Sequence, residues 1–309
     1  MIEAELFQRH RRRLFGVAYR MLGRASDAED VVQDAWLRYA DARPGDLRTP
    51  EAYLTTIVTR LCLDRLKSAR ATREEYVGTW LPEPVLTDDR VEPESSASLT
   101  ESLTLAYMVL LETLTPEERA VFVLREVFEY DYDEIAEMLD ITAANGRQLF
   151  HRAKTRVAER RPRFRVDAGA TRALVGRFVS ALRAGDGDAL TRVLADDVGF
   201  WSDGGGKVPA VRHPVAGRDA VVQVLVRIRR AAAALGVSID TITVDVVEVN
   251  HEPGLVMRVA GRLDSVYGLS VEGGAVAAVR IVRNPDKLRF FERQLVEASS
   301  SPRPGGDLV

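Results

Sequence analysis

Between residues 115 and 142 the sequence repeats the signal for the start of a helix, and this feature constrains the fold most. Thr115–Glu118 and Asp131–Glu134 both have the spacing of a capping box, in which side chains and backbone donors at a helix start satisfy each other. Thr142 can cap a third helix, expected from Ala143 to about Glu159. Two short helices joined by a tight turn, the second of them basic, predict a helix-turn-helix.

The charge is uneven along the chain, although its formal total is only −3. Residues 102–139 hold two basic and nine acidic side chains, and residues 140–165 hold eight and two. Local basic clusters, rather than the total charge, release counterions from phosphates, so the third helix is expected to contact DNA. A solvated basic helix in a helical bundle is the alternative. The DNA-contacting candidates are Thr142, Asn145, Arg147, Gln148, His151, Arg152 and Lys154.

The 309-residue chain is long enough for two or three domains. The expected divisions are a helical domain at 1–70, a polar linker at 71–101, a second helical domain at 102–164, an α+β domain at 168–298 and a disordered tail at 299–309. In the α+β domain, apolar and polar residues alternate near 241–246 and 255–259, between helices near 171–184 and 219–234. This predicts a curved antiparallel sheet wrapped around helices, a cone that encloses an apolar pocket.

Several classes of protein are excluded by what the sequence contains. No apolar run approaches the ~20 residues of a membrane span, and no signal peptide is expected. Cys62 is the single cysteine and the four histidines are scattered, so we expect no intrachain disulfide, metal site or cofactor. A cytoplasmic location without membrane association is the simplest interpretation.

The first helical segment has two further patterns. After Ser26, which with Glu29 has capping-box spacing, apolar residues recur at helical intervals, while Asp27, Asp30 and Asp34 share another face. Like charges at that spacing weaken an isolated helix, and a basic partner would relieve them. Favourable interaction with the helix dipole, plus solvation, is the competing explanation. A basic helix is expected from Glu51 to about Ala69.

At this point the motifs resemble those of extracytoplasmic-function sigma factors. Residues 27–38 look like their polymerase-binding helix, 52–66 resemble the helix that recognises the −10 element, and 114–154 resemble the domain that recognises the −35 element. The resemblance implies that RNA polymerase core and promoter DNA are the partners. It carries over core-binding roles to Asp27, Asp30, Gln33, Asp34, Trp36 and Leu37, and −10 roles to Arg48, Arg60, Arg65 and Lys67.

Three further stretches resemble the SigJ-like group, which carries a fused SnoaL-like domain of the nuclear transport factor 2-like superfamily. They are 76–84 in the linker, the glycine-rich 203–207, and 284–288. The resemblance implies that the third domain regulates in cis, and we expect the last two stretches to lie near the linker or the first domain. The regulatory candidates are Tyr76, Trp80, Leu81, Pro82, Asp203, Gly204, Gly205, Gly206, Lys207, Asn284, Pro285, Asp286, Lys287 and Leu288.

Other functions remain open on the sequence. The chain could be a SnoaL-like isomerase or cyclase fused to a DNA-binding module, or a helix-turn-helix regulator that binds duplex DNA alone. The acid–base candidates for catalysis are Asp196, Asp197, Asp203, His213, Asp264 and Asp286. No pair of them has a spacing that requires catalysis, so we expect a vestigial or ligand-sensing pocket rather than an enzyme. The run of glycines is expected to form a turn rather than a phosphate cradle.

Overall fold

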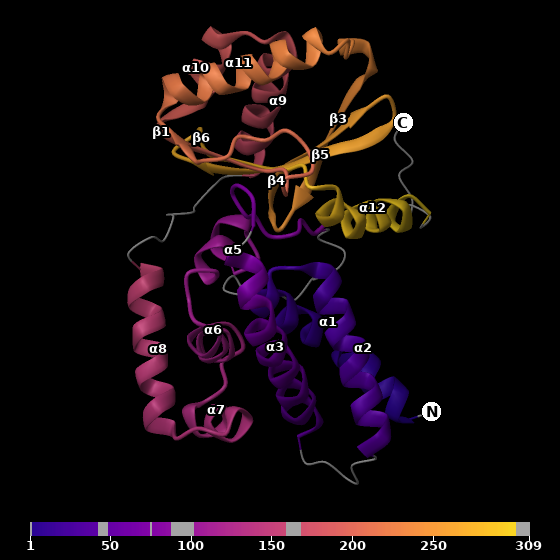
Figure 1. The fold of residues 1–309 in the computed structure, drawn as a ribbon, viewed down its shortest axis with the longest axis vertical. Helices are drawn as coiled ribbons and strands as arrows, with labels where there is room; N and C mark the ends of the chain where they lie inside the picture. Colours follow the sequence, from indigo (N-terminus) through magenta and orange to yellow (C-terminus); the bar gives the residue numbers. More distant parts are fainter. Residues whose placement is uncertain (1, 43–48, 75, 88–101, 159–167, 301–309) are drawn as a thin grey trace. The chain divides into compact units, whose positions relative to one another are not determined.

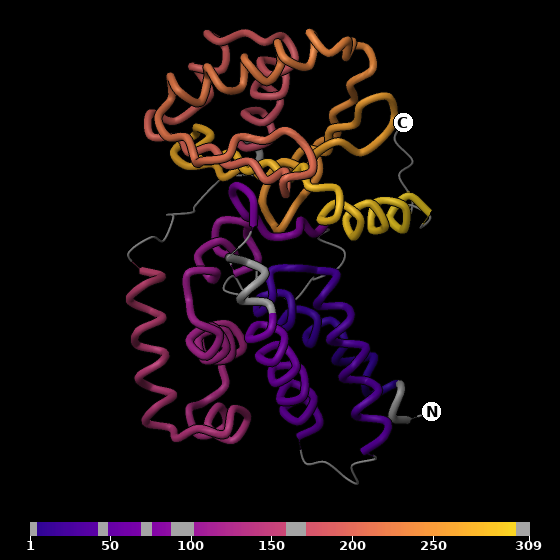
Figure 2. Tube along the Cα trace, viewed as in Figure 1, coloured from indigo at the N-terminus to yellow at the C-terminus, as the bar shows by residue number. Residues whose placement is uncertain are grey.

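A computed structural model describes residues 2–42, 49–74, 76–87, 102–158 and 168–300. The chain divides into a helical unit, made of residues 1–76 and 93–162, and a C-terminal unit, made of residues 77–92 and 163–309. Figure 1 labels the elements of both units, and Figure 2 traces the chain through them. Each unit is described by itself.

The helical unit begins with helices that pack on one another. They are α1 (Ile2–Leu22), α2 (Ala25–Ala42) and α3 (Pro50–Glu74). Their shared core contains the fully buried Leu14 and Val17 of α1, Val31 of α2, and Leu54 and Val58 of α3. These residues recur at helical spacing, so each helix buries one apolar stripe against the others.

The second part of this unit is the predicted helix-turn-helix. It comprises α5 (Leu105–Leu111), α6 (Pro116–Phe122), the π-helical η1 (Val123–Val127), α7 (Tyr132–Leu139) and α8 (Ala143–Ala158). Both predicted capping boxes, at Thr115 and Asp131, are present. Asp140 adopts the left-handed conformation (φ 56°) after α7, and the Thr142 side chain accepts a hydrogen bond from the backbone of Asn145, so the tight turn into α8 is also present.

The two helical parts, expected as separate domains, form one compact unit. Helix α3 packs on both α6 and α7. The buried Arg119 guanidinium donates to the carbonyl of Arg20 at 2.7 Å and pairs with Glu112. The Tyr130 hydroxyl lies 3.1 Å from that of Thr55. Polar side chains from one part therefore satisfy buried groups of the other.

The C-terminal unit contains a curved sheet with helices over one face. Its elements are α9 (Ala168–Ala184), α10 (Gly187–Val193), β1 (Leu194–Asp203), β2 (Val215–Ala216), α11 (Arg218–Ala234), the 3₁₀-helical η2 (Ile239–Thr241), β3 (Ile242–Val249), β4 (Glu252–Val259), β5 (Arg262–Glu272), β6 (Ala275–Val282) and α12 (Pro285–Ser300). The strand order is β2-β1-β6-β5-β4-β3. The expectation of an antiparallel sheet is wrong at one place, because β1 pairs with β6 in parallel. Parallel neighbours need a long connection, and here the chain between the two strands contains β2, α11 and β3–β5.

Side chains fill the space between this sheet and helices α9–α11. Phe178, Phe200, Leu255, Leu269 and Val279 are all fully buried there in one hydrophobic cluster. The α+β architecture expected for a SnoaL-like domain is therefore observed, with a packed interior along this cluster.

Three predicted boundaries are corrected. Helix α3 runs to Glu74 instead of ending near Ala69. Helix α2 begins at Ala25, so Ser26 lies in the first turn and not at the cap position. Residues 77–87 of the expected linker pack as part of the C-terminal unit, because buried polar groups of that unit bind them. No helix within the described ranges has the length and apolar composition needed to cross a membrane.

Candidate functional site

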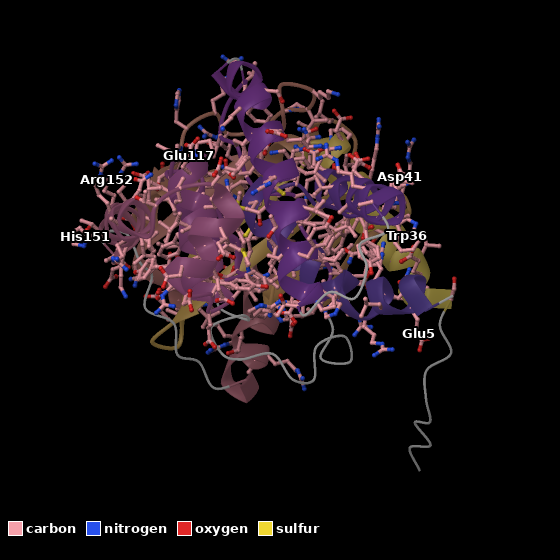
Figure 3. All side chains as sticks on the ribbon, turned by 90° about the horizontal axis from the view of Figure 1, so that it is seen from below. Glu5, Trp36, Asp41, Glu117, His151 and Arg152 are labelled. Carbon is pink, nitrogen blue, oxygen red and sulfur yellow. The ribbon has the colours of Figure 1, made fainter. Side chains whose placement is uncertain are left out.

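Helix α8 presents a continuous polar face to solvent. All the predicted contact residues on it are exposed, and its buried side is formed by Gly146, Ala153 and Val157. Figure 3 shows His151 and Arg152 projecting outward from the helix. A solvent-facing row with several hydrogen-bonding side chains on one helix is what insertion into a major groove requires.

Two basic side chains of α8 are held by neighbours in the same unit. The Arg147 guanidinium lies 5.6 Å from the ring centre of Tyr132, and the Lys154 ammonium lies 3.8 Å from a carboxylate oxygen of Glu126. Both are exposed, and exposed pairs contribute little free energy, so these side chains can exchange a protein partner for a phosphate.

The described −10 candidates on α3 all have partners within the helical unit. The Arg60 guanidinium donates to the carbonyls of Met138 (2.9 Å) and Glu137 (3.3 Å), at the end of α7. The Lys67 ammonium lies 3.6 Å from Glu117. Arg48 lies outside the described residues. In this arrangement Arg60 and Lys67 bind the second helical part.

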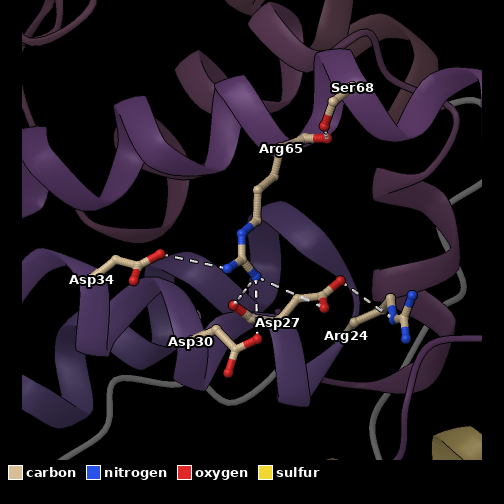
Figure 4. Close-up of polar contacts among 6 residues, drawn as sticks. All are labelled: Arg24, Asp27, Asp30, Asp34, Arg65 and Ser68. Carbon is tan, nitrogen blue, oxygen red and sulfur yellow. Dashed lines mark hydrogen bonds and ion pairs between the residues drawn. The ribbon is translucent and has the colours of Figure 1, made fainter.

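Arg65 of α3 lies among the acidic residues of α2 (Figure 4). Its guanidinium donates to the backbone carbonyl of Asp27 at 3.1 Å, and its nitrogens lie 3.8 Å from the Asp27 carboxylate, 3.6 Å from Asp30 and 3.5 Å from Asp34. The like charges on α2 are therefore relieved by a cation of the same chain. The sequence alone did not identify Arg65 as that cation, because the pairing depends on the packing of α2 against α3.

The remaining core-binding candidates lie on the outer side of α2. Asp30, Gln33 and Leu37 are exposed, and Leu37 is a large apolar side chain with 54% of its surface accessible. Trp36 packs its ring 5.1 Å from that of Phe7. A pocket of about 210 Å³ between α1 and α2 is lined by Phe7, Gln8, Arg11, Glu29, Val32, Gln33 and Trp36. Helix α2 therefore presents both an exposed apolar side chain and residues that line a pocket, which is typical of a protein-binding surface.

The C-terminal unit binds the linker through a buried polar cluster, which we call the linker clasp: Trp80, Leu81, Asp203 and Lys287. The Asp203 carboxylate accepts hydrogen bonds from the backbone N–H of Leu81 at 2.8 Å and from the Lys287 ammonium at 2.7 Å. Lys287 also donates to the Leu81 carbonyl at 2.5 Å and lies 4.2 Å from the ring centre of Trp80. The side chains of Asp203 and Lys287 are 0% and 4% exposed, so the backbone of Leu81 supplies hydrogen bonds to both members of a buried ion pair.

The two other predicted motifs of this unit surround the linker clasp. The Asp203 backbone carbonyl accepts from the N–H groups of Arg283 and Asn284, and Lys207 pairs with Asp286. The Asn284 side chain accepts from the backbone of Asp286, which caps α12. Of the other regulatory candidates, Pro82 and Leu288 are buried and Pro285 is exposed. Tyr76 belongs to the helical unit.

The glycines of the 203–207 loop are needed for close approach. Gly205 has a φ of 60°, and a Cβ there would lie 2.2 Å from the Asn284 amide. Gly206 has a φ of 69°, and a Cβ there would lie 3.1 Å from Val77 of the linker. The predicted glycine turn is present, and its bare backbone lets two segments pack against it.

A second contact between the linker and the C-terminal unit was not predicted. Leu86 forms an antiparallel bridge with Val249 on edge strand β3. The Asn250 side chain accepts from the backbone of Val85 at 3.0 Å, and the Gln294 side chain accepts from Leu86 at 2.9 Å. Residues 85–87 have no alternating strand pattern, so their sequence did not predict that they would pair with β3.

The acid–base candidates do not converge. Asp196 pairs with Arg218, Asp264 pairs with Arg283 at 2.8 Å, and Asp203 and Asp286 are bound as described above. Asp197 and His213 are exposed. Tyr267 belongs to the hydrophobic cluster between the sheet and the helices, and burial raises its pKa to about 12, with Asp264 adding to the shift.

Comparisons with known proteins agree with this architecture. Sigma-70 region 2 matches residues 6–72, and Sigma-70 region 4 matches residues 104–157. These matches define the helical unit as that of a sigma-70-type initiation factor. They also divide it at the same place as the two packed helical parts.

Full-length relatives give the particular family. The chain is 36% identical to the ECF RNA polymerase sigma factor SigJ of Mycobacterium tuberculosis over 316 aligned positions, which cover 99% of this chain and 98% of that protein. It is 31% identical to the probable ECF RNA polymerase sigma factor SigI of the same species, over 93% and 94% of the two chains. The crystal structure of SigJ matches with a TM-score of 0.72 over 92% of this chain and 98% of that one. The chain belongs to the ECF RNA polymerase sigma factors, and the predicted family and function are confirmed.

Proposed function

We propose that this sigma factor is regulated in cis through the linker clasp. The observation that carries the proposal is the buried Asp203–Lys287 pair, which binds the backbone of Leu81 on both its N–H and its carbonyl. The clasped segment lies between region 2 and region 4 in the sequence. Any change in the C-terminal unit that releases Leu81 therefore lengthens the free chain between the two promoter-binding regions.

The proposed division of labour follows from what each helix exposes. Helix α2 binds polymerase core through its acidic residues and Leu37, α3 contacts the −10 element through its basic side chains, and α8 reads the −35 element. The exposed face of α8 supports direct base contacts by Arg147 and Gln148, because their side chains pair bidentately with guanine and adenine. The cytoplasm is the proposed location, since the polymerase core acts there.

The basic groups of α3 support a regulated rather than a constitutive factor. Arg60 binds the end of α7 through two carbonyls in this structure, so it is not available to promoter DNA while the helical parts stay packed. Release of the linker is proposed to favour separation of the two parts. A ligand of the C-terminal unit remains a proposal that would require an opening in the packed cluster between sheet and helices.

In-vitro transcription with polymerase core across a promoter library tests the sigma-factor role and its regulation together. Lys207→Ala removes the ion pair with Asp286 beside the linker clasp, so it should alter transcription. The Lys207 side chain is 54% exposed, so its loss should not unfold the chain. Asp245→Ala is the matched control, because it removes an exposed pair with Arg258 on β3–β4, outside the linker clasp. If both variants match the wild type, the glycine loop is only a turn. If the wild-type chain gives no transcript with core from any promoter, even after removal of the C-terminal domain, the proposal fails.

A further inference from the structure

Arg65 connects two surfaces to which the proposed function gives different partners. It extends from α3, the proposed −10 helix, and its guanidinium lies between Asp27, Asp30 and Asp34 of α2, the proposed polymerase-binding helix (Figure 4). A single guanidinium is thus shared by carboxylates that a second protein is expected to use.

The ion pairs of Arg65 with the α2 carboxylates are weak enough for another cation to replace Arg65. The carboxylate distances are 3.5–3.8 Å, longer than those of a close charge-assisted hydrogen bond. The Arg65 side chain is 34% exposed, and those of Asp30 and Asp34 are 63% and 48% exposed. Water and salt reach the cluster, so a competing cation can replace Arg65 without burying an unpaired charge.

The carboxylates outnumber the cation. Arg24 also contacts Asp27, at 3.4 Å, but Asp30 and Asp34 have Arg65 as their shared basic contact in the cluster of Figure 4. Their excess negative charge therefore attracts a basic protein surface even while Arg65 is in place. Once such a surface pairs with Asp30 and Asp34, the guanidinium loses two of its three acidic neighbours and becomes available to a phosphate.

We propose that Arg65 couples polymerase binding to promoter binding by exchanging partners. In the free chain it occupies the acidic residues of α2. When a basic surface of polymerase core takes Asp30 and Asp34, Arg65 turns to the DNA backbone at the −10 element. Arg65 is a positioning residue in the first state and a DNA contact in the second, and this inference rests on the proposed function.

The test compares core affinity with promoter opening in the full-length chain. Arg65→Gln exposes the carboxylates, so the dissociation constant for core should fall about threefold at low ionic strength, with the gain shrinking at high salt. Promoter opening by holoenzyme saturated with the same variant should slow about tenfold, since a phosphate contact is lost. A variant that merely damaged packing would weaken both steps.

Arg24→Gln is the matched control. It removes a cation that contacts the same acidic cluster but precedes α2 and is not part of α3, so opening by saturated holoenzyme should stay at the wild-type rate. Asp30→Asn with Asp34→Asn gives the reciprocal result: weaker core binding, with opening at saturation retained. This pair also serves if Arg65→Gln folds poorly, which thermal unfolding would reveal.

The outcomes separate this inference from the function on which it rests. Unchanged or weaker core binding by a folded Arg65→Gln chain overturns the exchange, even where opening slows. Retained core affinity in the double Asp variant overturns it as well. Failure of the wild-type chain to bind core removes the proposed function itself, and the coupling with it.

Discussion

Single side chains in this protein connect segments that are far apart in the sequence. Asp203 and Lys287 are separated by 84 positions, yet they form a buried pair at 2.7 Å with the linker backbone between them. A buried carboxylate and ammonium are costly unless each has hydrogen-bond partners, and here Leu81 supplies both a donor and an acceptor. The stability of the C-terminal unit therefore depends on the linker.

Removing one member of that pair should destabilise the unit strongly. Asp203→Asn removes the carboxylate that pairs with the buried Lys287 ammonium, at a cost of about 3 kcal/mol in the free energy of unfolding. Adding Lys287→Met should recover a large part of the loss, because both charges of the pair are then absent. Chemical denaturation of the three chains measures this, and equal stability of the single variant and the wild type would contradict it.

A second residue-scale prediction concerns alkaline pH. Burial raises the pKa of Tyr267 from 10.0 to about 12, so the unfolded chain loses this proton at lower pH than the folded one. The contribution is complete below pH 10 and is lost as the pH rises to about 12. Tyr267→Phe cannot ionise, so its unfolding free energy should fall less than that of the wild type between pH 9 and pH 11. Parallel curves for the two chains would refute the assignment.

At the scale of elements, glycine positions decide how closely segments approach. Gly205 and Gly273 have similar left-handed φ values, 60° and 55°, but a Cβ would strike Asn284 at the first and meet open space at the second. Both positions need a residue that tolerates a positive φ, but only Gly205 also needs the absence of a Cβ to make room for Asn284. The 203–207 loop is thus defined by its contact with the start of α12.

The two glycines make a matched pair of substitutions. Gly273→Ala should cost about 1 kcal/mol, the strain of a left-handed alanine. Gly205→Ala should cost clearly more, because Asn284 must also move away from its capping position. Thermal unfolding measures both, and equal losses would show that the loop does not need the close approach.

Helix α8 carries the second prediction at this scale. Gln148→Ala should weaken binding at one base pair of the −35 element by about 1–3 kcal/mol and relax the preference there. Lys154→Ala should weaken binding evenly across sequences and lower the salt dependence by about one phosphate contact. Holoenzyme binding to a set of single-base promoter variants distinguishes the two patterns. Uniform loss with Gln148→Ala would count against direct base contact.

For the whole molecule, the main finding is that regions 2 and 4 pack into one unit. Arg60 caps the end of α7, and Arg119 reaches the end of α1. A guanidinium at a helix C-terminus satisfies carbonyls that have no partner within the helix. The same side chain cannot hold α7 and contact DNA, so packing and promoter binding compete.

This competition predicts a local change that can be measured. Arg60→Gln should loosen the end of α7 and raise the amide hydrogen-exchange rates of the turn from Asp140 to Thr142 severalfold. Lys67→Gln, which removes one exposed pair with Glu117, should leave that turn as protected as in the wild type. Equal exchange rates in the two variants would show that Arg60 does not stabilise the end of α7.

Local signals determined much of this protein from its sequence alone. The capping boxes at Thr115 and Asp131, the basic face of α8 and the glycine turn depend on residues a few positions apart, where spacing is enough to predict geometry. The tertiary structure decided the partners of Arg60, Arg65 and Lys287, the parallel pairing of β1 with β6, and the docking of residues 85–87 on β3. Those contacts join segments tens to hundreds of residues apart, and a side chain's charge in the sequence does not say which distant partner it will meet.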